Sequence, residues 1–90
     1  MNSQQLPMAF IKRVHQVMKS LFYVQAKLAC NYDTRYDSHV SPDKTALVLD
    51  ILNGDDPLAM EGVCHAFQKA GILHEVKGTQ IVIDFERNCA

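Results

Sequence analysis

Two stretches of the chain share one pattern of hydrophobic and polar residues. Thr45-Ala-Leu-Val-Leu-Asp-Ile51 and Thr79-Gln-Ile-Val-Ile-Asp-Phe85 both read Thr-x-aliphatic-Val-aliphatic-Asp-apolar, 34 positions apart. Further matches lie upstream, 50 positions apart: Pro7, Ala9, His15, Lys19 and Lys27 correspond to Pro57, Ala59, His65, Lys69 and Lys77. Such internal similarity indicates a duplicated structural unit. The first unit would contain about 16 additional residues between its two matching blocks, the difference between the two spacings.

The second unit is predicted to fold as helix, strand, strand. Asp56 is suited to cap a helix that begins at Pro57, and Gly71 is suited to end it. Between them the apolar residues recur on one helical face, which is expected to face the core: Ala59, Met60, Val63, Ala66, Phe67 and Ala70. Two strands, residues 72–77 and 80–86, are joined by Gly78-Thr79, the composition of a type II′ hairpin turn. This turn sets a register in which one strand face belongs to the core: Ile72, His74, Val76, Ile81, Ile83 and Phe85.

The first unit is expected to repeat this order with a longer hairpin. A helix over residues 6–21 is followed by alternating residues from Phe22 to Tyr32, which is strand periodicity. By analogy, Phe22 pairs with Ile51, Val24 with Leu49 and Ala26 with Leu47. A projecting arm would then span residues 29–45, with its loop at residues 33–39.

A second interpretation of the same segment stays open. Apolar residues continue at 4-3-4-3-4 spacing, so the helix could instead run to about residue 28 and dimerise as a short coiled coil. The residues with this spacing are Phe10, Val14, Val17, Leu21, Val24 and Leu28.

These elements predict one α+β domain over residues 1–90, built from two αββ units at about residues 6–52 and 56–86. The expected architecture is a four-stranded antiparallel sheet with both helices on one face. This α-β-β-α-β-β order is similar to the ferredoxin-like plan with its cut point moved, a likeness of fold that carries no function. Strand order, and any exchange of the arm between subunits, stay open.

Composition indicates a soluble globular protein. Of its 90 residues, 48% are hydrophobic and 21% charged. Lys12 and Arg13 interrupt the N-terminal apolar run, so no signal peptide is predicted, and no stretch approaches the length of a membrane span. Without such a span, no membrane partner is expected. Three cysteines (Cys30, Cys64 and Cys89) leave one unpaired in any intramolecular scheme, which favours a reducing, cytoplasmic setting.

Charge is divided unevenly along the chain. The first 30 residues contain four bases and no acid, whereas the other 60 contain all ten acids and five bases. A basic helix of this kind is a candidate surface for nucleic acid, with DNA as the expected ligand. The residues of this candidate surface are Lys12, Arg13, Lys19 and Lys27.

The uncovered face of the predicted sheet is a second candidate surface. Its mixture of apolar and polar residues is typical of a protein interface, and a homodimer is the simplest way to cover it. The candidate interface residues are Tyr23, Val48, Leu52, Leu73 and Val82.

The sequence contains no arrangement that indicates catalysis, a cofactor or a metal. Cys64 and His65 are adjacent on a helix and point about 100° apart, so they cannot work as a pair. His74 is expected to be a core histidine with one backbone partner, and residues 33–43 do not fit a calcium loop. We therefore expect a small non-enzymatic cytosolic binding or regulatory protein that acts as a homodimer through contacts with an unidentified protein partner. DNA binding through the first helix is the alternative.

Overall fold

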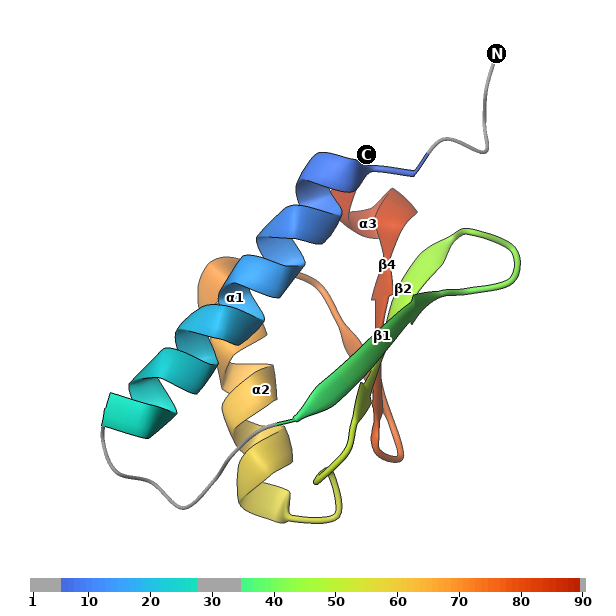
Figure 1. The fold of residues 1–90 in the computed structure, drawn as a ribbon. Coiled ribbons are helices and arrows are strands. Elements are labelled where there is room, and N and C mark those ends of the chain that lie inside the picture. The colour runs from blue at the N-terminus through green and yellow to red at the C-terminus, as the bar shows by residue number, and fades with distance from the viewer. Residues whose placement is uncertain (1–5, 28–34, 90) are drawn as a thin grey trace.

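The computed structural model describes residues 6–27 and 35–89. The elements follow one another in the order helix, two strands, helix, two strands and a short terminal helix (Figure 1). Their bounds are α1 (Met8–Lys27), β1 (Tyr36–Val40), β2 (Ala46–Ile51), α2 (Pro57–Ala70), β3 (Glu75–Lys77), β4 (Gln80–Asp84) and α3 (Phe85–Cys89).

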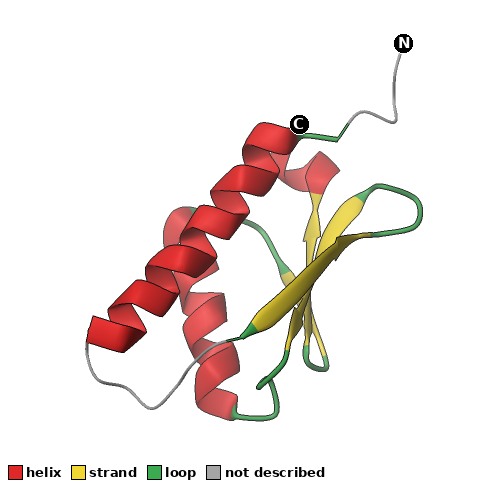
Figure 2. Ribbon diagram, viewed as in Figure 1, coloured by secondary structure: helices red, strands yellow, loops and turns green. Residues whose placement is uncertain are grey.

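The four strands form one antiparallel sheet in the order β1-β2-β4-β3. Helices α1 and α2 lie side by side on one face of this sheet, and Figure 2 shows the two layers. The α+β class and the antiparallel four-stranded sheet are thus confirmed, and a third helix is added. The core lies between the layers, where the inward residues of β2 and β4 meet those of the helices: Ile11, Val14, Met18, Leu47, Leu49, Ile51, Val63, Phe67, Ile72, Ile81, Ile83 and Phe85.

Helix α2 begins and ends where the sequence predicts. The Asp56 side chain accepts a hydrogen bond from the Leu58 N–H at 3.0 Å, which satisfies one of the free donors of the first turn. At the other end Gly71 is left-handed, with φ of 73°. The Gly71 N–H donates to the Gln68 carbonyl and the Ile72 N–H to the Phe67 carbonyl, the two bonds of a Schellman motif.

The β3–β4 hairpin also follows its turn residues. Gly78 has φ of 62°, as the first position of a type II′ turn requires, and Lys77 pairs with Gln80 and Val76 with Ile81. Strand β3 is shorter than predicted, because the Leu73 N–H and carbonyl are both bonded to the Asn88 side chain. The pairs that this register implies for Ile72 and His74 are therefore absent from the ladder. Val76, predicted on the core face, lies on an edge strand and is 47% exposed.

The first hairpin was predicted in the wrong place. Helix α1 continues to Lys27, so Tyr23 and Lys27 belong to a helix and not to a strand. The partner of β2 is residues 36–40, and Tyr36, in place of Phe22, pairs with Ile51. The predicted loop at residues 33–39 falls partly outside the described residues, and its described part is mostly strand. Residues 22–27 therefore follow the helical spacing of their apolar residues and not the strand-like alternation, in agreement with the second interpretation, a helix that runs to about residue 28.

The predicted last strand also ends early. Alternation suggested a strand to residue 86, but β4 ends at Asp84 and α3 begins at Phe85. The Asp84 carboxylate accepts the Arg87 N–H at 2.9 Å and so caps the turn. The Asn88 amide also donates to the Asp84 carbonyl at 2.7 Å, which holds α3 against the end of the sheet.

The β1–β2 turn is organised around one carboxylate. Asp43 accepts hydrogen bonds from the hydroxyls of Ser41 and Thr45, both at 2.7 Å, and from the Thr45 N–H at 3.2 Å. These hydrogen bonds hold the pKa of Asp43 below its ordinary value, because they favour the charged form of the carboxylate. The bond from the Ser41 hydroxyl has the largest effect. The stability they provide is present above the ordinary pKa and is lost as pH falls through the lower pKa of the folded protein.

Asp43→Asn is therefore expected to lower stability at neutral pH, with a difference from the wild type that shrinks in acid. Urea unfolding of both proteins between pH 6 and pH 2 measures this difference. The Ser41→Ala background is the control, since the first of the donors is then gone and the difference should be smaller at every pH. A difference that stays constant across the range would contradict the role of the carboxylate.

Candidate binding groove between the two long helices

Helices α1 and α2 run in opposite directions and face each other through two rows of residues spaced four apart. Row one is Arg13, Val17 and Leu21 of α1, and row two is Gly62, Ala66 and Ala70 of α2. Residues four apart lie on the same side of a helix, so each row is continuous. The side chains of the second row are only a hydrogen atom or a methyl group. They are too small to fill the space between α1 and α2 on the side that faces solvent.

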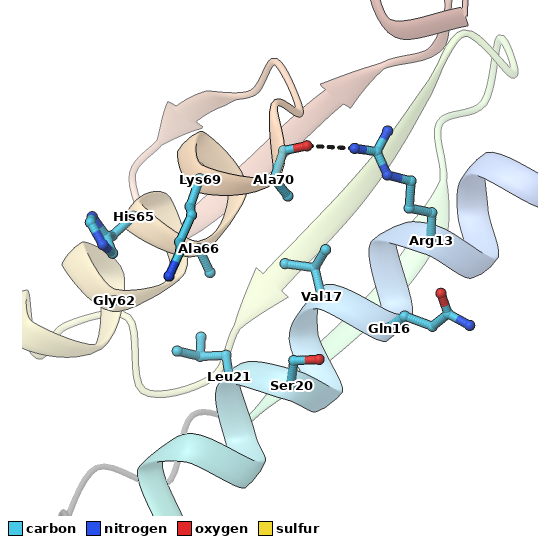
Figure 3. A pocket seen from close by; sticks show the side chains of 10 residues that line it. All are labelled: Arg13, Gln16, Val17, Ser20, Leu21, Gly62, His65, Ala66, Lys69 and Ala70. Carbon is cyan, nitrogen blue, oxygen red and sulfur yellow. Dashed lines mark hydrogen bonds between the residues drawn. The ribbon is translucent and has the colours of Figure 1, made fainter.

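The result is a groove of about 400 Å³ on the outer side of the helical layer. Figure 3 shows Val17 and Leu21 pointing from α1 toward α2, with Ala66 across from them. Val17, Leu21 and Ala66 are half-buried, so the floor is apolar and still reaches solvent. Hydrophobic floors of this kind are typical of binding sites. The residues that line the groove are Arg13, Gln16, Val17, Ser20, Leu21, Gly62, His65, Ala66, Lys69 and Ala70.

The rim of the groove is basic. Arg13 comes from α1, and His65 and Lys69 come from α2, all with exposed side chains. The lining contains no acidic residue. Arg13 and Lys69 carry a positive charge at pH 7, and because both side chains are exposed, their attraction for a negative group is modest and depends on the salt concentration.

Arg13 has a structural contact as well. Its guanidinium donates a hydrogen bond of 2.5 Å to the Ala70 carbonyl, one of the unpaired carbonyls at the end of α2 (Figure 3). A cation at this position also complements the negative end of the helix dipole. Because a guanidinium has five N–H donors, Arg13 can join the helices and still bind an anion.

The predicted basic surface is brought only partly into this groove. Lys12, Arg13 and Lys19 are exposed on α1, but among them only Arg13 lines the groove. Lys27 is the last residue of α1, and its side chain lies outside the described residues. Lys69 and His65 were missing from the predicted surface. In the repeat they match Lys19 and His15, which do not line the groove, so the repeat did not locate them.

The predicted interface residues do not form one patch. Val48 and Val82 pair directly across β2 and β4 on the uncovered sheet face, but Val48 is only 9% exposed and Val82 is half-buried. Leu52, just after β2, is 59% exposed, and Leu73, beside α3, is 55% exposed. Tyr23 belongs to α1. The structure thus brings two of the five residues into direct pairing.

Polar groups surround the valine pair. Gln80 donates to Asp50 at 2.6 Å, and the His39 Nδ1 lies 3.5 Å from the other Asp50 oxygen. Asp37 is the cross-strand partner of Asp50, so two carboxylates lie opposite each other on this face. The uncovered face is therefore more polar and more acidic than a homodimer interface requires.

Cys64, His15 and His74 lie in three separate surroundings. Burial raises the pKa of the Cys64 thiol, which disfavours the reactive thiolate. His15 bonds to the Tyr36 hydroxyl at 2.8 Å and stacks on that ring, and His74 has its expected backbone partner, the Ile72 carbonyl, at 3.0 Å. Among residues 6–27 and 35–89, no three His, Cys, Asp or Glu side chains are placed to hold a metal ion.

Comparison with models of protein families, with curated proteins and with solved structures finds no match to this chain. Within the described residues, no helix combines the length and the apolar composition needed to cross a bilayer.

Proposed function

We propose that this chain is a small non-enzymatic binding and regulatory protein that acts through protein–protein contacts, and that the groove between α1 and α2 is its binding site. The observation that carries the proposal is an apolar floor that stays open to solvent between basic side chains. A groove between two packed helices is a recurring site for a helix of another protein.

The sheet-face homodimer expected from the sequence has weaker support. Its central residue, Val48, exposes 9% of its surface, so little apolar area is left there for a second subunit to cover. Asp37 and Asp50 lie beside it, and two copies of this face would bring like charges together. The groove is the better candidate because its apolar residues are accessible and its charges have one sign.

DNA binding is the second candidate function, and the composition of α1 favours it. The helix carries Lys12, Arg13, Lys19 and Lys27 with no acid in its 20 residues. Phosphates are attracted by cations of this kind. An apolar floor contributes nothing to phosphate binding, however, and the whole chain has a net charge of −1. For these two reasons we rank DNA below a protein as the candidate partner.

The register of the sheet supports the duplicated, permuted ferredoxin-like plan, which we propose as the origin of the fold. Leu47 pairs with Ile83 and Leu49 with Ile81, symmetrically about the Val48–Val82 pair. In the repeat Leu47 matches Ile81 and Leu49 matches Ile83, so the two strands are related by an approximate twofold axis through the Val48–Val82 pair. Cys64 and Cys89 are free thiols, in agreement with the cytoplasmic location that we propose.

Filling the groove tests the proposed function. Ala66→Trp places a large ring over the floor, and Val82→Lys is the matched change on the sheet face. Proteins retained from a cell extract by the immobilised wild type are identified by mass spectrometry and compared with those retained by each variant. We expect specific partners to be lost with Ala66→Trp and kept with Val82→Lys. Partners that are kept by Ala66→Trp would contradict the groove.

The DNA alternative has its own measurement. Anisotropy of a labelled duplex is followed at low and at near-physiological salt. Binding that weakens steeply with salt and disappears in the Lys12→Ala, Arg13→Ala and Lys19→Ala triple variant would replace the protein partner with DNA. We expect no binding at near-physiological salt.

A further inference from the structure

We infer that the occupant of the groove is a short amphipathic helix with acidic residues on its flank, an inference that depends on the proposed function and names the class of partner. Its apolar residues would lie on Val17, Leu21 and Ala66, and its acidic residues would face Arg13 and Lys69. Three features of the groove lead to this conclusion: its length, its charge and the position of its cations.

The length of the groove fits a short helix. Each row spans eight residue steps, from 13 to 21 and from 62 to 70, which is about 12 Å at 1.5 Å per residue. A helix of two to three turns presents apolar side chains over the same length, at positions spaced three and four apart. The floor lies between two helices, so a third helix can pack there by the ordinary rules of ridges and grooves.

Charge excludes a second copy of α1 as the occupant. Helix α1 contains four bases and no acid, so two α1 helices in contact would bring eight cations together. The groove lining is also without an acid. An occupant with negative residues removes this repulsion and gains attraction, and it also associates faster because of long-range steering.

The two cations flank the groove from opposite helices. Arg13 contacts Ala70 at one end, and the Lys69 side chain runs along α2 back toward Ala66 (Figure 3). Leu21 lies at the other end of row one, away from Arg13. The occupant should therefore carry acidic residues on both flanks, one facing Arg13 and one facing Lys69, and an apolar residue over Leu21.

The inference is tested with synthetic peptides. The probe is a fluorescent, hydrocarbon-stapled helix of about 14 residues, a length at which an unstapled helix is marginal in water. Leucines at i, i+3, i+4 and i+7 form one face, and glutamates flank it. A matched peptide has lysine in place of every glutamate. Binding is measured by fluorescence anisotropy at near-physiological salt.

We expect the acidic peptide to bind the wild type more tightly than the basic peptide does. Lys69→Glu should weaken the acidic peptide about three- to tenfold and strengthen the basic one, because one rim pair changes from attraction to repulsion. Lys77→Glu is the matched control: it reverses an exposed lysine on β3 and should change neither affinity. Ala66→Trp should weaken both peptides, and circular dichroism checks that this variant folds.

The possible outcomes distinguish a failure of the acidic occupant from a failure of the groove as a binding site. Equal binding of both peptides, or an equal effect of Lys69→Glu and Lys77→Glu, would overturn the acidic occupant and leave the groove as a binding site. No peptide binding, with protein partners still lost in Ala66→Trp, would show that the groove takes a different segment. No peptide binding and no partner sensitive to Ala66→Trp would end both proposals. Displacement of the acidic peptide by duplex DNA would assign the surface to nucleic acid instead.

Discussion

Phe67→Ala is expected to lower the free energy of unfolding by about 3–5 kcal/mol, the usual cost of truncating a fully buried aromatic residue. Phe67 is 0% exposed and is the largest side chain among the fully buried residues. Its ring lies 5.7 Å from that of His74, between α2 and the sheet. Because a domain of this size is stable by only about 5–15 kcal/mol, the change removes a large part of the total. Urea unfolding followed by circular dichroism measures it.

Leu58→Ala is the matched control for this prediction. Leu58 lies on the same helix but is 51% exposed, so its loss should change stability by no more than about 0.5 kcal/mol. If Phe67→Ala does not fold, Phe67→Leu supplies a measurable value, since it keeps much of the volume. Equal effects of the Phe67 and Leu58 changes would contradict the position of Phe67 in the core.

The second unit was predictable because its signals are local and agree with one another. Asp56 and Pro57 start α2, Gly71 ends it in the left-handed conformation, and Gly78 sets the hairpin turn. Each of these residues determines backbone geometry within a few positions, without reference to the rest of the fold. Burial of Phe67 then follows from the helical period.

The first unit was mispredicted because residues 22–32 satisfy two periods at once. An apolar run can pass for a strand or a helix, and helix α1 takes it as far as Lys27. The strand that replaces it, β1, contains Asp37 and Ser38, which have low strand propensity. Pairing with the buried strand β2 outweighs that propensity, and such tertiary contacts cannot be read from local sequence.

The repeat was informative for the strands and misleading for the helices. Leu47 and Ile81 match at the predicted offset and are both buried. In the helices the buried pair Val14 and Val63 is 49 positions apart, one less than the matched residues. One residue rotates a helical face by about 100°, so the identities at the larger offset do not share an orientation.

The groove was only partly visible in the sequence. The basic residues of α1 were identified, but Ala66 and Ala70 were assigned to the core face of α2. Of the two, Ala70 does pack against the core, and both also line the groove. The missing information was the row of small residues, Gly62, Ala66 and Ala70, and the fact that it faces Val17 and Leu21. That arrangement arises from packing between helices about 50 positions apart, which no local pattern encodes.

Gly54→Ala is expected to lower the free energy of unfolding by about 1–3 kcal/mol, because the new methyl group would be overpacked. A Cβ at this position would lie 2.9 Å from the Ile51 carbonyl oxygen and 2.9 Å from the Thr79 Cβ. Neither neighbour can move freely, since the Ile51 carbonyl accepts the Gly54 N–H and the Ile51 N–H donates to the Thr79 carbonyl. Thermal and urea unfolding measure the change.

The sign of the Gly54→Ala effect shows which of two contributions is larger: overpacking in the folded protein, which destabilises, or restriction of the unfolded chain, which stabilises. Gly54 does not have a positive φ, so alanine would meet no backbone strain there. In an open turn, the same substitution stabilises a protein by about 0.4–1 kcal/mol, because it restricts the unfolded chain. Asp55→Ala, at the exposed neighbour, is the control and should have an effect within about 0.5 kcal/mol. A stabilising Gly54→Ala would show that the turn before α2 has room to yield and that its contact with the β3–β4 turn is not tight.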